Sequence, residues 1–216
     1  MANNKTKNTL IVFLKYPEAG KVKTRLAKDL GDQRAAEIYS EMSLEIINNV
    51  LDTSSYNTII FYDPPEKEKE NEIRNWIGKK EVQYLPQVGN TLGDKISNAF
   101  KEVFSSKSKR AVIIGTDCTD VTSETITQAI KSLTDVDVVL GPAVDGGYYL
   151  LGLNNHTPEI FKGIKWSTES VLNQTIEKIK ENKLSYELLN TLQDIDTLDD
   201  LNTRFESFYK TAESNS

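Results

Sequence analysis

Residues 111–120 read AVIIGTDCTD, and this stretch is the strongest indication of the fold class. Its apolar, mostly β-branched first part, Ala111–Ile114, is typical of a strand that is buried on both faces of a sheet. The strand is expected to end at Gly115, before a polar loop that contains Asp117 and Asp120. Ligands of open α/β sheets bind at the carboxyl ends of the strands, so these carboxylates are expected to belong to a site. The alternative is that they only cap and solubilise the loop.

The rest of the chain alternates between strand-like and helix-like segments. A helix is expected from about 122 to 133, with Thr122 as its N-cap. Other strands are expected at 9–14, 57–62, 82–85, 136–140 and 148–153. Other helices are expected at 32–51, at 66–77 and after Gly93. The alternation predicts an α/β protein with a three-layer α/β/α, Rossmann-like arrangement and a mostly parallel sheet. We expect one domain over residues 1–216, with an ordered core of about 9–210.

The composition restricts the partners and the kinds of metal site. The formal net charge of -6 argues against a nucleic-acid or membrane partner, because both require clustered Lys and Arg. One cysteine, Cys118, and one histidine, His156, provide neither an internal disulfide nor a set of zinc ligands, so any metal must bind through oxygen. The first residues, MANNKTKN, lack the apolar segment of a secretion signal, and no apolar run is long enough to span a bilayer. A cytoplasmic location is expected.

The loop after the first predicted strand, KYPEAGKVKTRL at residues 15–26, is unusually basic for this acidic chain. Gly20 interrupts regular structure, and the cationic side chains are Lys15, Lys21, Lys23 and Arg25. Backbone amides with Lys and Arg in this position can bind the diphosphate of a nucleotide. The loop is neither a P-loop nor a dinucleotide-binding turn, and a solvated basic loop is the alternative.

Two further segments contain glycines next to polar residues. Gly89 and Gly93 enclose a loop whose backbone could approach a flat ring, so either a nucleotide base or an ordinary loop explains them. Asp145 precedes Gly146 and Gly147, which could leave room beside the carboxylate for a donor sugar. The alternative is that the glycines only form a turn and Asp145 is a second metal ligand.

Convergence of carboxylates would favour a divalent cation. If Asp145 lies near Asp117, their repulsion raises the pKa of each carboxyl, and a cation removes this cost. Carboxylate oxygens beside a diphosphate suit Mg²⁺ or Mn²⁺.

The C-terminal part contains two capping patterns. Ser167 is expected to cap a helix, and Trp166 before it could pack on that helix or stack on a ligand. The segment 194–196, DID, is a D-x-D sequence, yet Thr197 and Asp200 have the spacing of a capping box. We therefore interpret the D-x-D as part of a helix cap and not as a site, and the tail TAESNS as frayed.

Six segments, in this order, resemble one known family: KYPEAGKVKTRL, QVGNTLGD, IIGTDCTD, GPAVDGGYYLLGL, WSTESVL and DIDTLDDL. They resemble small bacterial glycosyltransferase-A-type proteins known as arsenosugar-biosynthesis-type glycosyltransferases. The resemblance covers residues 9–203 and is most specific at GTDC and DGGYYL. It implies the nucleotide-diphosphosugar transferase fold, which the molybdenum-cofactor nucleotidylyltransferases share.

The resemblance also implies roles for single residues. The loop from Lys15 to Arg25 would hold the diphosphate, and Gln87–Gly93 would border the base and ribose. Asp117 would bind the metal, and Asp145 would lie next to the donor sugar. The chain departs from the family at Thr119 and Val121, where Pro and Leu are usual, so the loop is expected to be less rigid.

Three functions follow from these observations. The first is a metal-dependent glycosyltransferase that moves a sugar from a nucleotide-diphosphate donor to a small-molecule acceptor of unknown identity, with Asp145 acting on the acceptor hydroxyl. The second is a nucleotidylyltransferase that joins an NTP to a phosphorylated metabolite. Its glycine-rich triphosphate turn would here be reduced to Gly20. The third is a non-enzymatic nucleotide-binding module.

The candidate residues fall into four groups. The candidate nucleotide-binding residues are Lys15, Gly20, Lys21, Lys23, Arg25, Gln87, Gly89, Leu92 and Gly93. The candidate ligands of Mg²⁺ or Mn²⁺ are Asp117 and Asp120. The candidate sugar or acceptor contacts are Gly146, Gly147, Tyr148, Trp166, Ser167 and Thr168. The candidate catalytic residue is Asp145.

Overall fold

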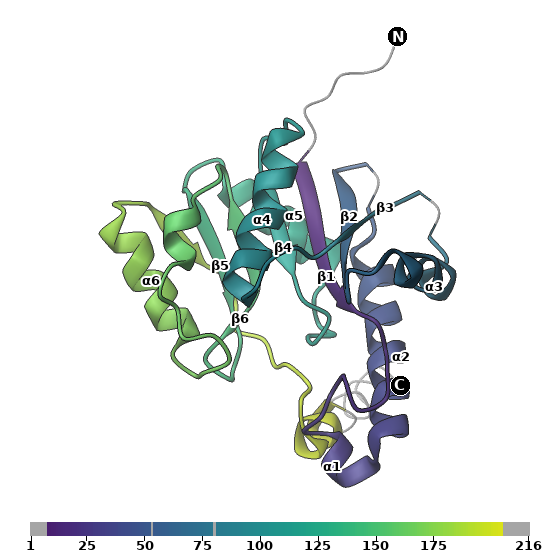
Figure 1. The fold of residues 1–216 in the computed structure, drawn as a ribbon. Coiled ribbons are helices and arrows are strands. Elements are labelled where there is room, and N and C mark those ends of the chain that lie inside the picture. Colours follow the sequence, from purple (N-terminus) through teal and green to yellow (C-terminus); the bar gives the residue numbers. More distant parts are fainter. Residues whose placement is uncertain (1–7, 53, 80, 205–216) are drawn as a thin grey trace, which may run out of the picture.

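The computed structural model describes residues 8–52, 54–79 and 81–204, which form a seven-stranded sheet with helices on both faces (Figure 1). The strand order is β3-β2-β1-β4-β6-β5-β7. The strands are β1 (Asn8–Lys15), β2 (Tyr56–Asp63), β3 (Gln83–Pro86), β4 (Ala111–Ile114), β5 (Val138–Pro142), β6 (Tyr148–Leu153) and β7 (Tyr186–Leu188). Only β6 runs against its neighbours, β4 and β5, and the other pairs are parallel. The predicted mostly parallel sheet is therefore confirmed.

The helices occupy the connections between the strands. They are α1 (Ala27–Leu30), α2 (Asp32–Val50), α3 (Lys67–Ile77), α4 (Leu92–Ser105), α5 (Ser123–Ser132), the 3₁₀ turn η1 (Pro158–Phe161) and α6 (Val171–Glu181). Residues 198–204 are also helical, and this segment lies beside α1 below the sheet (Figure 1). No helix in the described part of the chain is long and apolar enough to cross a lipid bilayer.

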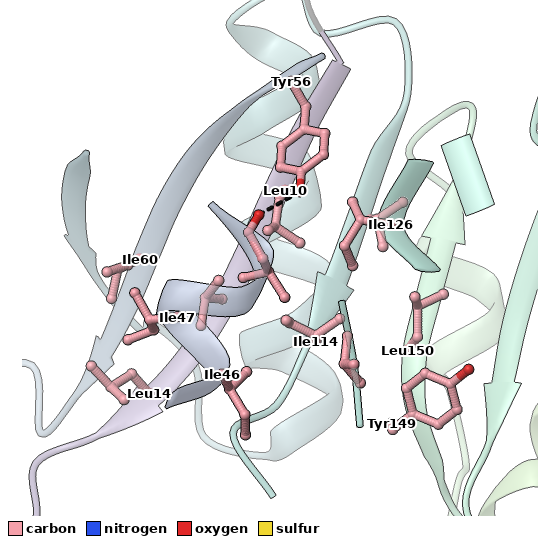
Figure 2. Packing of buried hydrophobic residues seen from close by; sticks show 14 of the residues in the cluster. Leu10, Leu14, Ile46, Ile47, Tyr56, Ile60, Ile114, Ile126, Tyr149 and Leu150 are labelled. Atoms are coloured by element: carbon pink, nitrogen blue, oxygen red, sulfur yellow. Dashed lines mark hydrogen bonds between the residues drawn. The ribbon is translucent and has the colours of Figure 1, made fainter. Parts of the chain in front are cut away.

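The interior strand β1 shows why three layers form. Leu10 and Leu14 pack on the face that α2 and α5 cover, whereas Ile11 packs on the face that α4 and α6 cover. Side chains alternate between the two faces of a strand, so an uninterrupted apolar strand needs a helical layer on each side. Figure 2 shows the first of these layers, in which Ile47 of α2 and Ile126 of α5 lie close to the apolar side chains of the sheet. The predicted three-layer α/β/α arrangement is confirmed.

Local capping determines where two helices begin near the carboxyl edge of the sheet. Thr91 accepts a hydrogen bond from the backbone N–H of Asp94, whose carboxylate accepts from Thr91 N, and this capping box starts α4. Thr122 and Thr125 form the corresponding box at α5, so the predicted N-cap at Thr122 is confirmed. Such caps each contribute about 1 kcal/mol, and they bring the loops that precede both helices back to the ends of β3 and β4.

Two predicted boundaries are wrong. Ser167 does not cap α6: it has a left-handed φ of 62°, and α6 begins four residues later with Ser170 as its N-cap. The strand expected at 136–140 is displaced to Val138–Pro142, because Asp137 is held by hydrogen bonds to Ser185 and the chain continues through Pro142 against β6. The predictions for the N-terminal segment 1–7, for the end of the ordered core near 210 and for the tail 211–216 lie outside the described residues.

Candidate functional site

The candidate site lies at the carboxyl edge of the sheet, where the chain after β7 crosses the ends of two other strands. Leu192 forms a bridge with Ala143, directly after β5, and accepts a hydrogen bond from Val144 N. Three residues later, Ile195 N donates to the carbonyl oxygen of Asp117 at 3.0 Å. These backbone contacts bring the 194–196 segment to the loop that follows β4.

Lys23 is the central residue of this site. Its ammonium nitrogen lies 2.5 Å from Oδ1 of Asp117 and 2.9 Å from Oδ1 of Asp196. The side chain of Lys23 is only 3% exposed, whereas those of Asp117 and Asp196 are 53% and 35% exposed. Burial alone would lower the pKa of Lys23, but the two carboxylates outweigh it and raise that pKa above its ordinary value. Lys23 is therefore a fully charged ammonium between two carboxylates that solvent reaches.

Apolar contacts on both sides of Lys23 explain its burial. Val22 packs on Ala36 and Tyr39 of α2. Leu26 packs on the same helix in a cluster that also contains Ile195. Because Ile195 is buried beside Leu26, the next residue, Asp196, is brought to the basic loop. The packing of Val22, Leu26 and Ile195 thus positions the charged side chains of Lys23 and Asp196.

Tyr39 connects the basic loop to the loop after β4. Its hydroxyl oxygen accepts a hydrogen bond from Lys15 N at 3.0 Å and lies 2.9 Å from Oγ1 of Thr116. Burial, and then the nearby Asp117 carboxylate, raise the pKa of Tyr39 above its ordinary value. Tyr39 is consequently a neutral phenol that fixes the backbone next to Asp117.

A second carboxylate pair lies next to Lys23 and its partners. The pKa of Asp194 is raised to about 6, first by partial burial and then by the charge of Asp145, with smaller effects from Asp196 and Asp117. The raised pKa is found at a residue that the sequence interpretation set aside, and it reports that Asp145 lies near Asp194. The predicted proximity of Asp145 to Asp117 stays a prediction. The Asp145 carboxylate itself accepts a hydrogen bond from Gly147 N at 2.8 Å.

Gly146, the first glycine after Asp145, is required by the local backbone geometry. Gly146 has a φ of 87°, and a Cβ atom there would lie 2.1 Å from the carbonyl oxygen of Glu169. The space that was expected to receive a donor sugar is therefore filled by backbone on the Gly146 side. This favours the alternative in which the glycines form a turn, and it leaves the role of Asp145 itself open to test.

The predicted base-binding segment is anchored within the fold. The Gln87 amide nitrogen donates to the carbonyl oxygens of Leu14 and Phe61, at 3.3 and 2.9 Å, and its side chain is buried between β1 and β2. A Cβ atom at Gly93 would lie 2.8 Å from Nε1 of Trp166. The flat ring that approaches this glycine is thus the indole of Trp166 in the protein itself.

The remaining candidates divide into those near the site and those with other contacts. Trp166 also packs edge-on against Tyr148, with ring centroids 6.5 Å apart. Asp120 forms an ion pair with Arg204 of the C-terminal helical segment, whereas Lys23 pairs with Asp117. The candidates that are exposed at the surface are Lys15, Gly20, Lys21, Arg25, Gly89, Leu92, Ser167 and Thr168.

The carboxylates fit a hard divalent cation that a substrate helps to bind. Among the residues that the structure describes, no group of three or more His, Cys, Asp or Glu side chains is arranged to hold a metal. Asp117 and Asp196 nevertheless share one cation, the Lys23 ammonium, through carboxylate oxygens. Mg²⁺ is commonly bound by one or two protein carboxylates together with substrate phosphates and water, and Asp117 and Asp196 match that number of protein ligands.

Asp196 is the residue that sequence reasoning missed. The predicted capping box is confirmed, because the Asp200 carboxylate accepts hydrogen bonds from Thr197 N and Oγ1. The D-x-D does belong to the cap, because Asp196 N donates to the Asp200 carboxylate, but the Asp196 side chain also binds Lys23, which the interpretation did not include. The D-x-D sequence was the available signal.

Comparison with solved structures finds chains at different degrees of similarity. A protein from Desulfovibrio desulfuricans G20, named provisionally as a nucleotide-diphospho-sugar transferase, is 31% identical, with a TM-score of 0.87 over 93% of this chain and 87% of that one. CMP:2-keto-3-deoxy-manno-octonic acid synthetase complexed with CTP is 8% identical, with a TM-score of 0.59 over 95% of this chain and 99% of that one. Rv0371C from Mycobacterium tuberculosis H37Rv, in complex with manganese, is 12% identical, with a TM-score of 0.53 over 93% and 99%.

The sequence comparisons identify the family to which this chain belongs. No curated protein matches the chain significantly. Residues 46–168 match the family described as "Uncharacterized protein conserved in bacteria (DUF2064)", and they include β4, the Asp117 loop, Asp145 and Trp166. The match covers more than half of the 216 residues, and the D. desulfuricans protein is similar over nearly the whole chain. The chain therefore belongs to the DUF2064 family and has the fold of the nucleotide-diphospho-sugar transferases.

Proposed function

We propose that this protein is a metal-dependent glycosyltransferase that transfers a sugar from a nucleotide-diphosphate donor to a small-molecule acceptor. The observation that carries the proposal is the contact of Lys23 with Asp117 and Asp196 at the carboxyl edge of the sheet. A basic loop and a carboxylate pair in direct contact are complementary to a diphosphate and a divalent cation, respectively. The similarity to the D. desulfuricans protein supports this donor class.

Each group of residues has a separate task in this proposal. Asp117 and Asp196 hold the cation, which when bound neutralises the charge of the leaving diphosphate. The exposed cations of the basic loop, Lys21 and Arg25, bind the phosphates and orient the donor. Asp145 accepts the proton of the acceptor hydroxyl. Asp194 lies close enough to Asp145 to influence this step electrostatically, because the charge of Asp145 contributes to its raised pKa.

Nucleotidylyl transfer is the second candidate, and the structural similarity to a CTP-bound synthetase is the observation that favours it. In that reaction the same loop would bind a triphosphate, and pyrophosphate would leave. We propose it as the alternative because a fold shared at 8% identity is compatible with either reaction. The third possibility is a nucleotide-binding module without activity, which would release neither a nucleoside diphosphate nor pyrophosphate.

One experiment separates the three candidates. The purified protein is incubated with radiolabelled UDP- and GDP-sugars, or with NTPs and sugar phosphates, each with and without Mn²⁺. A glycosyltransferase should release UDP or GDP slowly even when water is the acceptor, and the release should require Mn²⁺. Pyrophosphate release from an NTP would select nucleotidylyl transfer. Binding without any product would contradict both enzymatic functions.

Several finer assignments are proposals at this stage. They are the arsenosugar-biosynthesis-type subfamily, a single domain over residues 1–216, a cytoplasmic location and the remaining candidate contacts of the sequence analysis. The choice of Mg²⁺ or Mn²⁺ is also a proposal, and the manganese complex of Rv0371C supports Mn²⁺ as the first probe.

A further inference from the structure

The ammonium group of Lys23 occupies the position between the two carboxylates that the proposed metal requires. Its nitrogen is 2.5 Å from Oδ1 of Asp117 and 2.9 Å from Oδ1 of Asp196, and the side chain is 3% exposed. A Mg²⁺ ion would bind carboxylate oxygens at about 2.0–2.1 Å, and an Mn²⁺ ion would use the same oxygens. The ammonium and a divalent ion therefore compete for the same two atoms.

Electrostatic repulsion disfavours simultaneous binding of the ammonium and a divalent ion. A divalent ion bound to Asp117 Oδ1 would lie within about 4 Å of the Lys23 ammonium, where the repulsion is about 2 kcal/mol even at the dielectric constant of water. The metal should therefore bind more tightly when Lys23 has left. A buried ammonium that leaves its carboxylates needs another anion, and a diphosphate that binds to the basic loop provides one.

We propose that Lys23 is an internal competitor of the metal and that it couples metal binding to diphosphate binding. Without a ligand, Lys23 offsets part of the charge of Asp117 and Asp196, beside Arg25 at 3.7 Å from Asp196, and so keeps the affinity for divalent ions low. A diphosphate attracts Lys23 away from the carboxylates and so vacates the metal position. Such coupling is reciprocal, because each ligand removes a cost that the other would otherwise meet. The inference rests on the proposed metal and diphosphate site, but it concerns which charged side chains contact one another in the protein without ligands.

The direct test measures Mn²⁺ binding in the absence of nucleotide, with Lys23→Met as the variant. Methionine keeps most of the length of the side chain and removes the charge. Mn²⁺ affinity, measured by calorimetry or from the EPR signal of free Mn²⁺, should rise about tenfold or more over wild type. Lys28→Met is the matched control, because Lys28 is an exposed lysine of α1 and gives the same change in net charge. Its Mn²⁺ affinity should stay within about twofold of wild type.

A second measurement uses the wild-type chain and so does not depend on the folding of a variant. Buried lysine reacts slowly with an amine-acylating reagent, and mass spectrometry reports the rate at each lysine. Saturation with Mn²⁺ should increase acylation of Lys23 severalfold and leave Lys28 unchanged. An Mn²⁺ affinity of Lys23→Met equal to that of wild type would overturn the inference. So would an equal gain in Lys28→Met, or an unchanged Lys23 rate with bound Mn²⁺.

These outcomes are separate from the outcome of the proposed function. Failure of wild-type protein to release UDP or GDP from any donor would contradict the glycosyltransferase, yet the metal measurements without nucleotide would still report competition by Lys23. Conversely, turnover with an unchanged Mn²⁺ affinity in Lys23→Met would overturn the competition and leave the glycosyltransferase intact.

Discussion

Asp194→Asn should stabilise the protein at neutral pH and leave its stability unchanged in acid. In the folded protein the Asp194 pKa is raised from 3.8 to about 6, so the folded state holds this proton more tightly than the unfolded state. A raised carboxyl pKa means that the free energy of unfolding falls as pH rises from about 4 to 6. Asparagine removes the charge that causes the loss while it keeps the shape of the side chain.

The expected gain follows from the size of the shift. A change of about two pKa units corresponds to at most about 3 kcal/mol, because one unit is about 1.4 kcal/mol. Asp194 is only half-buried, and solvent screening reduces this figure to about 1–1.5 kcal/mol. The variant should therefore be more stable than wild type by that amount at pH 7–8, and equal to it near pH 4.

Urea denaturation at both pH values, in a chelating buffer, measures the effect. Asp135→Asn serves as the control, because Asp135 is an exposed residue in a turn and its replacement should change stability by less than about 0.5 kcal/mol at either pH. A gain for Asp194→Asn that is the same at pH 4 and pH 7 would contradict the electrostatic explanation. No gain at pH 7 would show that Asp194 is not electrostatically strained.

Three further predictions concern ligands. Asp117→Asn should abolish the Mn²⁺ dependence of nucleotide binding in calorimetry, because it removes a charged oxygen ligand of the proposed metal; an unchanged dependence would remove Asp117 from the metal site. Replacing Lys21 and Arg25 together by alanine should weaken UDP and GDP far more than uridine and guanosine, since charged contacts go to phosphate. Equal losses would make the loop merely structural. Asp145→Asn should keep nucleotide affinity within a few fold and lower turnover about a hundredfold, whereas joint loss of nucleotide and Mn²⁺ binding would make it a metal ligand.

The sequence predicted those features of the fold that local chemistry determines. β4 begins and ends where the apolar run 111–114 does, because Gly115 follows and both faces of the strand are covered. The N-cap at Thr122 was predictable because the cap and its partner lie three residues apart. Ser167 was not, because its left-handed backbone belongs to a loop that packs through Trp166 on the distant Gly93.

The candidate site shows the same division between local and distant contacts. The capping box at Thr197 is local and was recognised. The pairing of Asp196 with Lys23 depends on the packing of Ile195 and Leu26 in one apolar cluster. No local sequence pattern predicts this long-range contact. In the same way, Gly93 indicated a flat ring, but only the fold shows that the ring belongs to Trp166.

The contact between Lys23 and Asp196 spans 173 residues, and this has a consequence for the order of folding during synthesis. The strands β1, β2, β3 and β4 can pair once the chain has left the ribosome as far as Ile114, the end of β4. The carboxylate partner from the C-terminal part arrives only after β7, and closing so long a loop is a slow step in folding. Until then Lys23 can pair with Asp117 but not with Asp196. A nascent chain should therefore complete the ion pairs of Lys23 last. Ribosome-bound chains halted before residue 192 should accordingly show a protected sheet and a Lys23 that still reacts with acylating reagents.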